Sequence, residues 1–286
     1  MDRRLFLQSM GLTAVAGFAL NCADTSDSET PAMEMSKAGL GLSTVGLQLY
    51  TLRSIVNNDF EPVIRRVAEI GFKEVEMAGY HNLTPEQIRS LMDELNISAP
   101  STHMGSDAFK NNLEQIIGEG QVLGHDYLIC PHPGGLPYET IDDYKAMADF
   151  FNEVGAKVKA GGMKFAYHNH EFEFEEIDGQ LPMNVLMENT DPDLVDIELD
   201  LCWATAAGAD AAAYFAEHPG RFPLCHVKDY SLADKELRNV GAGDVDFAGI
   251  FANADVAGLK HYIVEHDHPG DDPYESISIS FAHVTG

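Results

Sequence analysis

The sequence predicts an α/β protein built as a (β/α)8 barrel, because short β-like runs alternate with amphipathic helical windows from Thr44 to the C-terminus. The eight β-like runs cover residues 45–50, 74–77, 97–103, 127–130, 164–168, 195–199, 224–227 and 262–265. An open, doubly wound sheet would show the same alternation, but it typically carries a Gly-rich first turn. Residues 48–53 read QLYTLR, without such glycines. The barrel is therefore the preferred fold.

The helical windows between these runs have a clear apolar periodicity. Apolar residues recur at positions 63, 64, 67 and 70, and Thr84 is suited to cap a helix over residues 85–95 with Pro85 in its first turn. Windows over residues 144–160 and 209–217 continue the pattern. In such a barrel the C-terminal ends of the strands lie together, and the active site is expected there.

Composition limits the classes of partner. The chain has 286 residues, 45% of them hydrophobic, which is enough for one large domain or two small ones with a buried core. With 46 acidic and 18 basic residues its formal net charge is −28. Such a charge repels phosphate backbones, so it argues against nucleic acid as a partner and against a DNA-repair endonuclease on the same barrel.

The first 43 residues are predicted to lie outside the barrel. Residues 1–22 are interpreted as a signal peptide, in which DRRLFLQ resembles a twin-arginine export signal and the apolar stretch over residues 9–20 is too short to span a bilayer. The run ALNC resembles a lipoprotein box, so a lipid anchor at Cys22 and ordinary cleavage both remain open. Residues 23–43 are expected to form a flexible acidic tether. The protein is thus expected to be exported, either periplasmic or anchored to the bacterial envelope, and to meet the membrane only through Cys22.

Three strand-end residues indicate a metal site. Asp200, His226 and Glu265 each stand one step beyond an apolar run on successive strands, so their side chains should converge. Oxygen and nitrogen donors suit one hard or borderline divalent ion, with Mn2+ preferred and Mg2+, Co2+ or Zn2+ as alternatives. Such an ion can stabilise the enediolate formed when a proton is removed beside a sugar carbonyl.

Residues 167–174 read YHNHEFEF and supply candidate acids and bases. Because alternate side chains of a strand share a face, His168 and His170 are predicted to point the same way, as catalytic residues. Strand parity does not decide between Glu171 and Glu173. Lys228, two residues after His226, is a third catalytic candidate that could bind a substrate oxygen or polarise a carbonyl; pairing with Asp229 or another local carboxylate is the alternative.

Further polar and aromatic residues at strand ends are candidates for binding substrate, and Trp203 is suited to stack on a sugar ring. These candidates are Gln48, Arg53, Glu76, His103, His132 and Trp203.

Several motifs in this order resemble the sugar phosphate isomerase/epimerase family with the xylose isomerase-like barrel. They are QLYTLR, VEMAGY, APSTH, YHNHEFEF, LDLCW, GRFPLCHVKDY and IVEHD. The resemblance implies a divalent metal bound by Glu, Asp, His and Glu on consecutive strands, and Asp200, His226 and Glu265 fall on the last three positions. At the first position this chain reads FAYH over residues 165–168, so a histidine of the HNH run, Glu173 or water must supply that ligand. We assign it to Glu173.

The resemblance also narrows the reaction. Trp203 stands where many epimerases of the family carry a proton-transferring histidine, and YHNHEFEF with HVKD is similar to an exported branch acting on 3-keto-glycosides. The expected function is therefore a metal-dependent isomerase, epimerase or lyase acting on a keto-sugar or keto-glycoside, with 3-keto-glycoside lyase or hydrolase as its narrower form. A non-catalytic carbohydrate-binding or sensory lipoprotein on the same barrel is the alternative.

Overall fold

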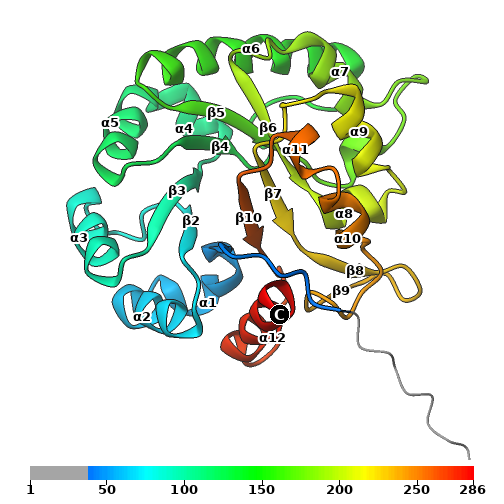
Figure 1. The fold of residues 1–286 in the computed structure, drawn as a ribbon. Coiled ribbons are helices and arrows are strands. Elements are labelled where there is room, and N and C mark those ends of the chain that lie inside the picture. Colours follow the sequence, from blue (N-terminus) through cyan, green and yellow to red (C-terminus); the bar gives the residue numbers. More distant parts are fainter. Residues whose placement is uncertain (1–37) are drawn as a thin grey trace, which may run out of the picture. The chain divides into compact units, whose positions relative to one another are not determined.

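The computed structural model describes residues 38–286, which form a closed barrel of eight parallel strands (Figure 1). Around the barrel the strands follow the order β1-β10-β7-β6-β5-β4-β3-β2, so the last strand of the barrel pairs with the first. The predicted barrel is confirmed. The expected signal peptide, lipoprotein box and most of the tether lie outside the described residues.

The elements occur in the following order along the chain. They are β1 (Gly46–Gln48), the 3-10 helix η1 (Leu49–Leu52), α1 (Arg53–Val56), α2 (Phe60–Ile70), β2 (Glu74–Ala78), α3 (Pro85–Leu95), β3 (Ser98–His103), α4 (Ser106–Asn111), α5 (Leu113–Leu123), β4 (Tyr127–Cys130), α6 (Ile141–Ala160), β5 (Lys164–His168), η2 (Phe172–Phe174), α7 (Pro182–Asn189), β6 (Val195–Asp200), α8 (Leu201–Ala206), α9 (Ala211–Glu217), β7 (Leu224–Val227), β8 (Asp229–Ser231), β9 (Glu236–Arg238), α10 (Phe247–Phe251), α11 (Ala254–Ala257), β10 (His261–Val264) and α12 (Pro273–Thr285).

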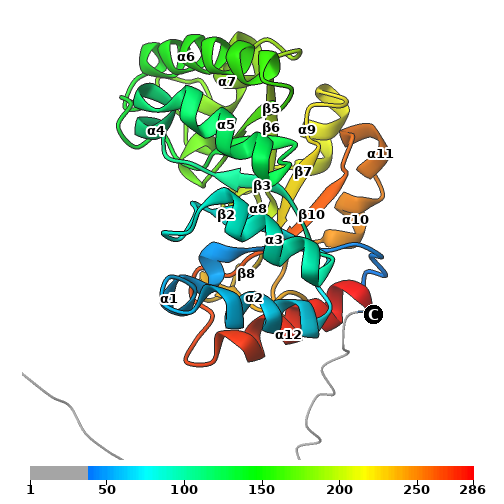
Figure 2. The same ribbon diagram turned by 90° about the vertical axis from the view of Figure 1, so that its left-hand side faces the viewer.

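The helices surround the strands, and the main core lies between the two layers (Figures 1 and 2). α3 begins with a capping box between Thr84 and Gln87 and has Pro85 in its first turn, which confirms the predicted cap. α6 begins with a second capping box, between Thr140 and Asp143. These caps satisfy N–H groups that a helix cannot bond internally, so the two helices start at defined positions against the barrel.

The inside of the barrel differs from this core because most of its side chains are polar. Four apolar residues inside it, Tyr127, Ile129, Ala166 and Leu224, form a small cluster separate from the main core. Bulky branched side chains usually fill such an interior. Here buried carboxylates and imidazoles from β2, β3, β5, β6 and β7 contact one another across it, and they lead directly to the candidate site.

Two predicted boundaries at the start of the barrel are wrong. The first strand, expected over residues 45–50, ends at Gln48 because the side chain of Gln48 accepts a hydrogen bond from the N–H of Tyr50 and the chain turns into η1. Residues 40–42, expected in the tether, donate backbone hydrogen bonds to the C-terminal residues 283–286 instead. The N–H groups of Leu40 and Leu42 donate to the carbonyls of His283 and Val284, at 3.0 and 2.9 Å.

The antiparallel hairpin β8–β9, which the sequence reading did not include, directly follows β7. Both carboxylate oxygens of Asp229 accept backbone N–H bonds, those of Tyr230, Gly241, Gly243 and Val245 among them. Asp229 therefore organises the loop that follows Lys228 and does not pair with Lys228. Among residues 38–286 no helix combines the length and the apolar character that a membrane crossing requires.

Candidate active site

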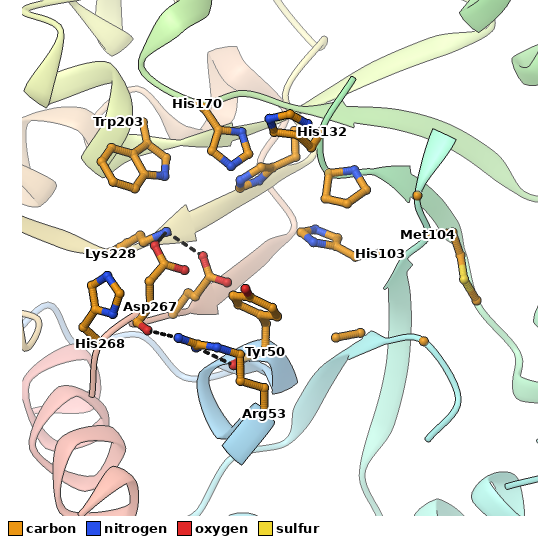
Figure 3. Close-up of a pocket in the computed structure, with 16 residues that line it drawn as sticks. Tyr50, Arg53, His103, Met104, His132, His170, Trp203, Lys228, Asp267 and His268 are labelled. Atoms are coloured by element: carbon orange, nitrogen blue, oxygen red, sulfur yellow. Dashed lines mark hydrogen bonds and ion pairs between the residues drawn. The ribbon is translucent and has the colours of Figure 1, made fainter. Parts of the chain in front are cut away.

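A cavity of about 730 Å³ opens at the C-terminal ends of the barrel strands (Figure 3). Eight of the predicted site residues line it: Arg53, His103, His132, His168, His170, Trp203, Lys228 and Glu265. Gln48 and Glu76, which were expected to contact substrate, do not line it. Both are fully buried, and they lie inside the barrel.

Asp200, His226 and Glu265 form a compact group of buried ligand atoms. One ligand atom from each residue lies within 4.8 Å of the others. Nδ1 of His226 is 3.0 Å from Oε2 of Glu265 and 3.9 Å from Oδ2 of Asp200. Oδ1 of Asp200 caps α8 by accepting the N–H groups of Cys202 and Trp203, at 2.9 and 3.1 Å, which leaves Oδ2 directed toward the group. Three of the four residues predicted as metal ligands are thus together, with two carboxylates and one imidazole available for an ion.

His168 on β5 lies beside Asp200 of this group, and Glu173 is directed elsewhere. Nε2 of His168 lies 3.7 Å from Oδ2 of Asp200. The carboxylate of Glu173 instead accepts bonds from the hydroxyl of Tyr167 and, at 2.7 Å, from the N–H of His170. Burial raises the pKa of Glu173 to about 7. Glu173, to which we assigned the fourth ligand, is thus turned away from the group, and His168 is the residue of the HNH run that lies beside Asp200.

A second group of possible ligand atoms shares His226 with the first. His103, His168, Glu198 and His226 offer ligand atoms within 4.8 Å of one another. Burial and the Glu76 carboxylate raise the pKa of Glu198 to about 7. Burial also raises the pKa of Glu76, but the imidazoles of His103 and His226 outweigh it and hold that pKa well below the usual value. Although burial lowers the pKa of His103, Glu76 and Glu198 raise it to about 9.

Lys228 lies where the ligand group meets the cavity. Its Nζ is 3.3 Å from Oδ2 of Asp200, 2.8 Å from Oε2 of Glu265 and 2.6 Å from Oδ2 of Asp267. Burial lowers the pKa of Lys228, but these three carboxylates outweigh it and hold the pKa well above the usual value. The ammonium also lies 4.9 Å from the centre of the Trp203 ring. Lys228 is thus a protonated donor held beside the ligand group.

Three rings, those of Trp203, His170 and His132, lie in a row along one wall of the cavity (Figure 3). The rings of His170 and Trp203 are stacked with centroids 6.3 Å apart, and His132 meets His170 edge-on at 5.3 Å. Burial lowers the pKa of His170 to about 3 and also lowers that of His132, so both imidazoles are neutral at neutral pH. This wall therefore offers uncharged aromatic faces.

The opposite wall carries charged and polar groups from the loops after β1 and β10 (Figure 3). Arg53 donates from Nη2 to the carbonyl of Asp267 at 2.5 Å, and its guanidinium lies 4.3 Å from the centre of the Tyr50 ring. Tyr50, Asp267 and His268 line the cavity and were not among the predicted site residues. The substrate space is consequently charged on one side and aromatic on the other.

Sequence reasoning also missed Glu198, although a signal for it was present. Glu198 lies two residues before Asp200 on β6, and alternate residues of a strand share a face. Asp267 lies two residues after Glu265, but it is beyond the end of β10, where the alternation of side chains along a strand no longer predicts their direction. Its contact with Lys228 depends on the loop conformation.

Comparisons with known proteins agree with this geometry. The sequence model of the xylose isomerase-like TIM barrel family matches residues 64–280. An inosose dehydratase from Clostridium perfringens is 28% identical over 146 residues, which cover 43% of this chain and 46% of the relative. The chain thus spans about half the length of the first curated relatives that it matches.

Two solved structures share the architecture. A sugar phosphate isomerase/epimerase from Parabacteroides distasonis superposes with a TM-score of 0.73 at 26% identity, covering 90% of this chain and 97% of the other. The 3-keto-D-glucoside 4-epimerase from E. coli superposes with a TM-score of 0.64 at 16% identity, covering 84% of this chain and 98% of the other. The second likeness concerns the fold alone.

Proposed function

Because the chain belongs to the xylose isomerase-like TIM barrel family, we propose that it is a metal-dependent enzyme that acts on a keto-sugar by removing a proton beside the carbonyl. The names of its relatives support this class, since they include an inosose dehydratase and a sugar phosphate isomerase/epimerase. The narrower form of the proposal is a lyase or hydrolase of 3-keto-glycosides.

The observation that carries the proposal is the convergence of Asp200, His226 and Glu265 beside the cavity. Two carboxylates and an imidazole, with His168 as a fourth neighbour, are donors that suit Mn2+, Mg2+, Co2+ or Zn2+. A divalent ion held there supplies Lewis-acid stabilisation of negative charge on the ketone and neighbouring hydroxyl oxygens. We prefer Mn2+ because the set mixes oxygen and nitrogen donors and has no thiolate.

The remaining polar groups have the positions that proton transfer needs. His170 lines the cavity, and its Nδ1 has no hydrogen-bond partner among residues 38–286, so we assign it as the base. When the C–H bond beside the ketone breaks, the proton goes to His170 and the electron pair forms an enolate. Lys228 is the acid on the side of the ligand group.

Two outcomes follow from this enolate. In an elimination, the bond from the adjacent carbon to the glycosidic oxygen breaks, and the departing oxygen takes the electron pair and a proton from Lys228. In an epimerisation, Lys228 gives a proton to the same carbon on its opposite face, and proton exchange with solvent restores Lys228 and His170. His168 contacts Asp200 and Glu198, so we assign it to the metal site and not to proton transfer.

The cavity supports a glycoside as the substrate. Its volume of about 730 Å³ lies in the range of pockets that bury drug-sized ligands, which are larger than a single sugar ring. The aromatic wall of Trp203, His170 and His132 provides flat faces for stacking on a sugar ring or on the group attached to it. The leader over residues 1–22 supports the further proposal that the reaction takes place outside the cytoplasm.

Hydrogen exchange at the substrate carbon tests this function. The Mn2+-loaded protein is incubated with methyl and 4-nitrophenyl 3-keto-glucosides in D2O, and NMR follows both the C2–H signal and release of the attached group. We expect loss of the C2–H signal with the parent protein. Release of the attached group identifies elimination, whereas inversion without release identifies epimerisation.

A matched variant connects the exchange to the ligand group. Asp200→Asn keeps an oxygen that can cap α8 but removes the charge, so the variant should fold, bind Mn2+ weakly and show no exchange. Binding of the keto-glucoside without any exchange by the Mn2+-loaded parent would favour the carbohydrate-binding alternative. Full metal occupancy in Asp200→Asn would contradict the ligand assignment.

A further inference from the structure

Glu76 lies on the opposite side of His226 from the ligand group. Nε2 of His226 is 2.8 Å from Oε1 of Glu76, whereas Nδ1 faces Glu265 at 3.0 Å and Asp200 at 3.9 Å. β2 and β7 are not neighbours in the barrel, so the contact between Glu76 and His226 crosses its interior. Both side chains are fully buried, and solvent does not compete for this contact.

The position of Glu76 is fixed by its neighbours in the sheet. Strand pairing places Gln48, Glu76 and Ser101 side by side on β1, β2 and β3. Nε2 of Gln48 donates to Oε1 of Glu76 at 2.6 Å, and the hydroxyl of Ser101 donates to Oε2 at 2.5 Å. Gln48 and Ser101 thus hold the carboxylate of Glu76 in one orientation inside the barrel.

A metal-binding imidazole uses one ring nitrogen, and the group that accepts a hydrogen bond from the other nitrogen fixes its tautomer and orientation. We propose that Glu76 is a positioning residue: it accepts the Nε2 proton of His226, so that the Nδ1 lone pair points at the space between Asp200 and Glu265. Glu76 therefore acts through His226 and does not touch the substrate.

The second group, that of His103, His168, Glu198 and His226, offers the competing arrangement, in which Nε2 of His226 would itself bind an ion. The contacts of Glu76 argue against it. Nε2 of His226 lies 2.8 Å from Oε1 of Glu76, and Nε2 of His103 lies 2.7 Å from Oε2 of Glu198 and 2.9 Å from Oε1 of Glu76, so both Nε2 atoms already contact carboxylates.

Glu76→Gln tests the proposal because it keeps the shape of the side chain and removes its charge. Calorimetric titration with Mn2+ should show one equivalent bound to the parent and affinity weakened by about 10- to 100-fold in the variant, the usual effect of losing such a partner. The test uses no substrate, so its result is independent of the proposed reaction.

Glu74→Gln is the matched control. Glu74 also lies on β2 and pairs with an imidazole, since its Oε2 is 2.9 Å from Nδ1 of His261. This pair shares no residue with the ligand group. Glu74→Gln should therefore keep the Mn2+ affinity of the parent, and an equal loss in both variants would overturn the specific role of Glu76.

A second measurement needs no variant of Glu76. In the Zn2+-loaded parent, which is diamagnetic, 15N NMR should find the His226 proton on Nε2 and the metal at Nδ1, with His226→Gln used to assign the signal. A proton on Nδ1 would overturn the proposal. Binding of a second equivalent of Mn2+ that is lost in His103→Ala would also overturn it, because Nε2 of His226 would then be a ligand atom.

Discussion

Oε2 of Glu265 is shared between two nitrogen atoms, since it lies 2.8 Å from Nζ of Lys228 and 3.0 Å from Nδ1 of His226. Nζ of Lys228 also reaches Asp200 and Asp267. This one carboxylate oxygen therefore contacts both His226 of the metal-ligand group and Lys228, the residue that we assign as the acid. Changes at Lys228 should separate metal binding from turnover.

Lys228→Met removes the ammonium and keeps an unbranched side chain. We expect the turnover number to fall by roughly 10²- to 10⁴-fold, the usual contribution of a positioned acid or base. Mn2+ affinity should stay equal or rise, because a competing cation leaves Asp200 and Glu265. Steady-state kinetics and calorimetry measure the two effects, and loss of Mn2+ binding would place Lys228 among the groups that build the metal site.

Trp203→Ala should weaken substrate binding more than Trp203→Phe. The indole is half-buried at the cavity wall, where it stacks with His170 and lies under the Lys228 ammonium. Loss of an aromatic face costs about 1 kcal/mol, so KM should rise roughly fivefold in Trp203→Ala. A smaller ring should keep most of the binding. Equal KM values for the parent and both variants would remove Trp203 from the substrate wall.

Glu173→Gln should change how stability depends on pH. Burial raises the pKa of Glu173 from 4.5 to about 7, so the folded state favours the protonated carboxyl. As pH rises from about 4.5 to about 7, the unfolded chain ionises Glu173 first and the parent loses stability relative to the variant. The difference is complete above that window. Urea unfolding of both proteins at pH 4 and pH 8 measures it, and a constant difference in free energy would contradict the assignment.

Gly155 on α6 is expected to be intolerant of a side chain. A Cβ at this position would lie 2.4 Å from the carbonyl oxygen of Leu194, which precedes β6. Gly155→Ala should therefore lower the free energy of unfolding by about 1–3 kcal/mol, as overpacking does. Gly118 on α5 is the control, because a Cβ there meets no atom within 4 Å. Gly118→Ala should raise stability by about 0.5–1 kcal/mol, and thermal unfolding of the two variants gives the comparison.

Much of the candidate site follows from local sequence. Asp200, His226 and Glu265 stand at the ends of apolar strands, and the barrel brings all three together. The direction of Glu173 did not follow, because a 3-10 turn over Phe172–Phe174 carries its carboxylate back to Tyr167. The alternation of side-chain direction ends where the strand ends, so the turn that follows decides where the side chain of Glu173 points.

The sequence by itself determined the alternation of strands and helices and the kind of side chain at each strand end, because both depend on short-range periodicity. Only the tertiary structure decided which ring nitrogen of His226 faces Glu265 and which faces Glu76, and that Gln48 and Glu76 are buried inside the barrel. The reason is physical: closure of the barrel joins β1 to β10 and brings β2 across from β7, and these distances depend on the stagger of all eight strands.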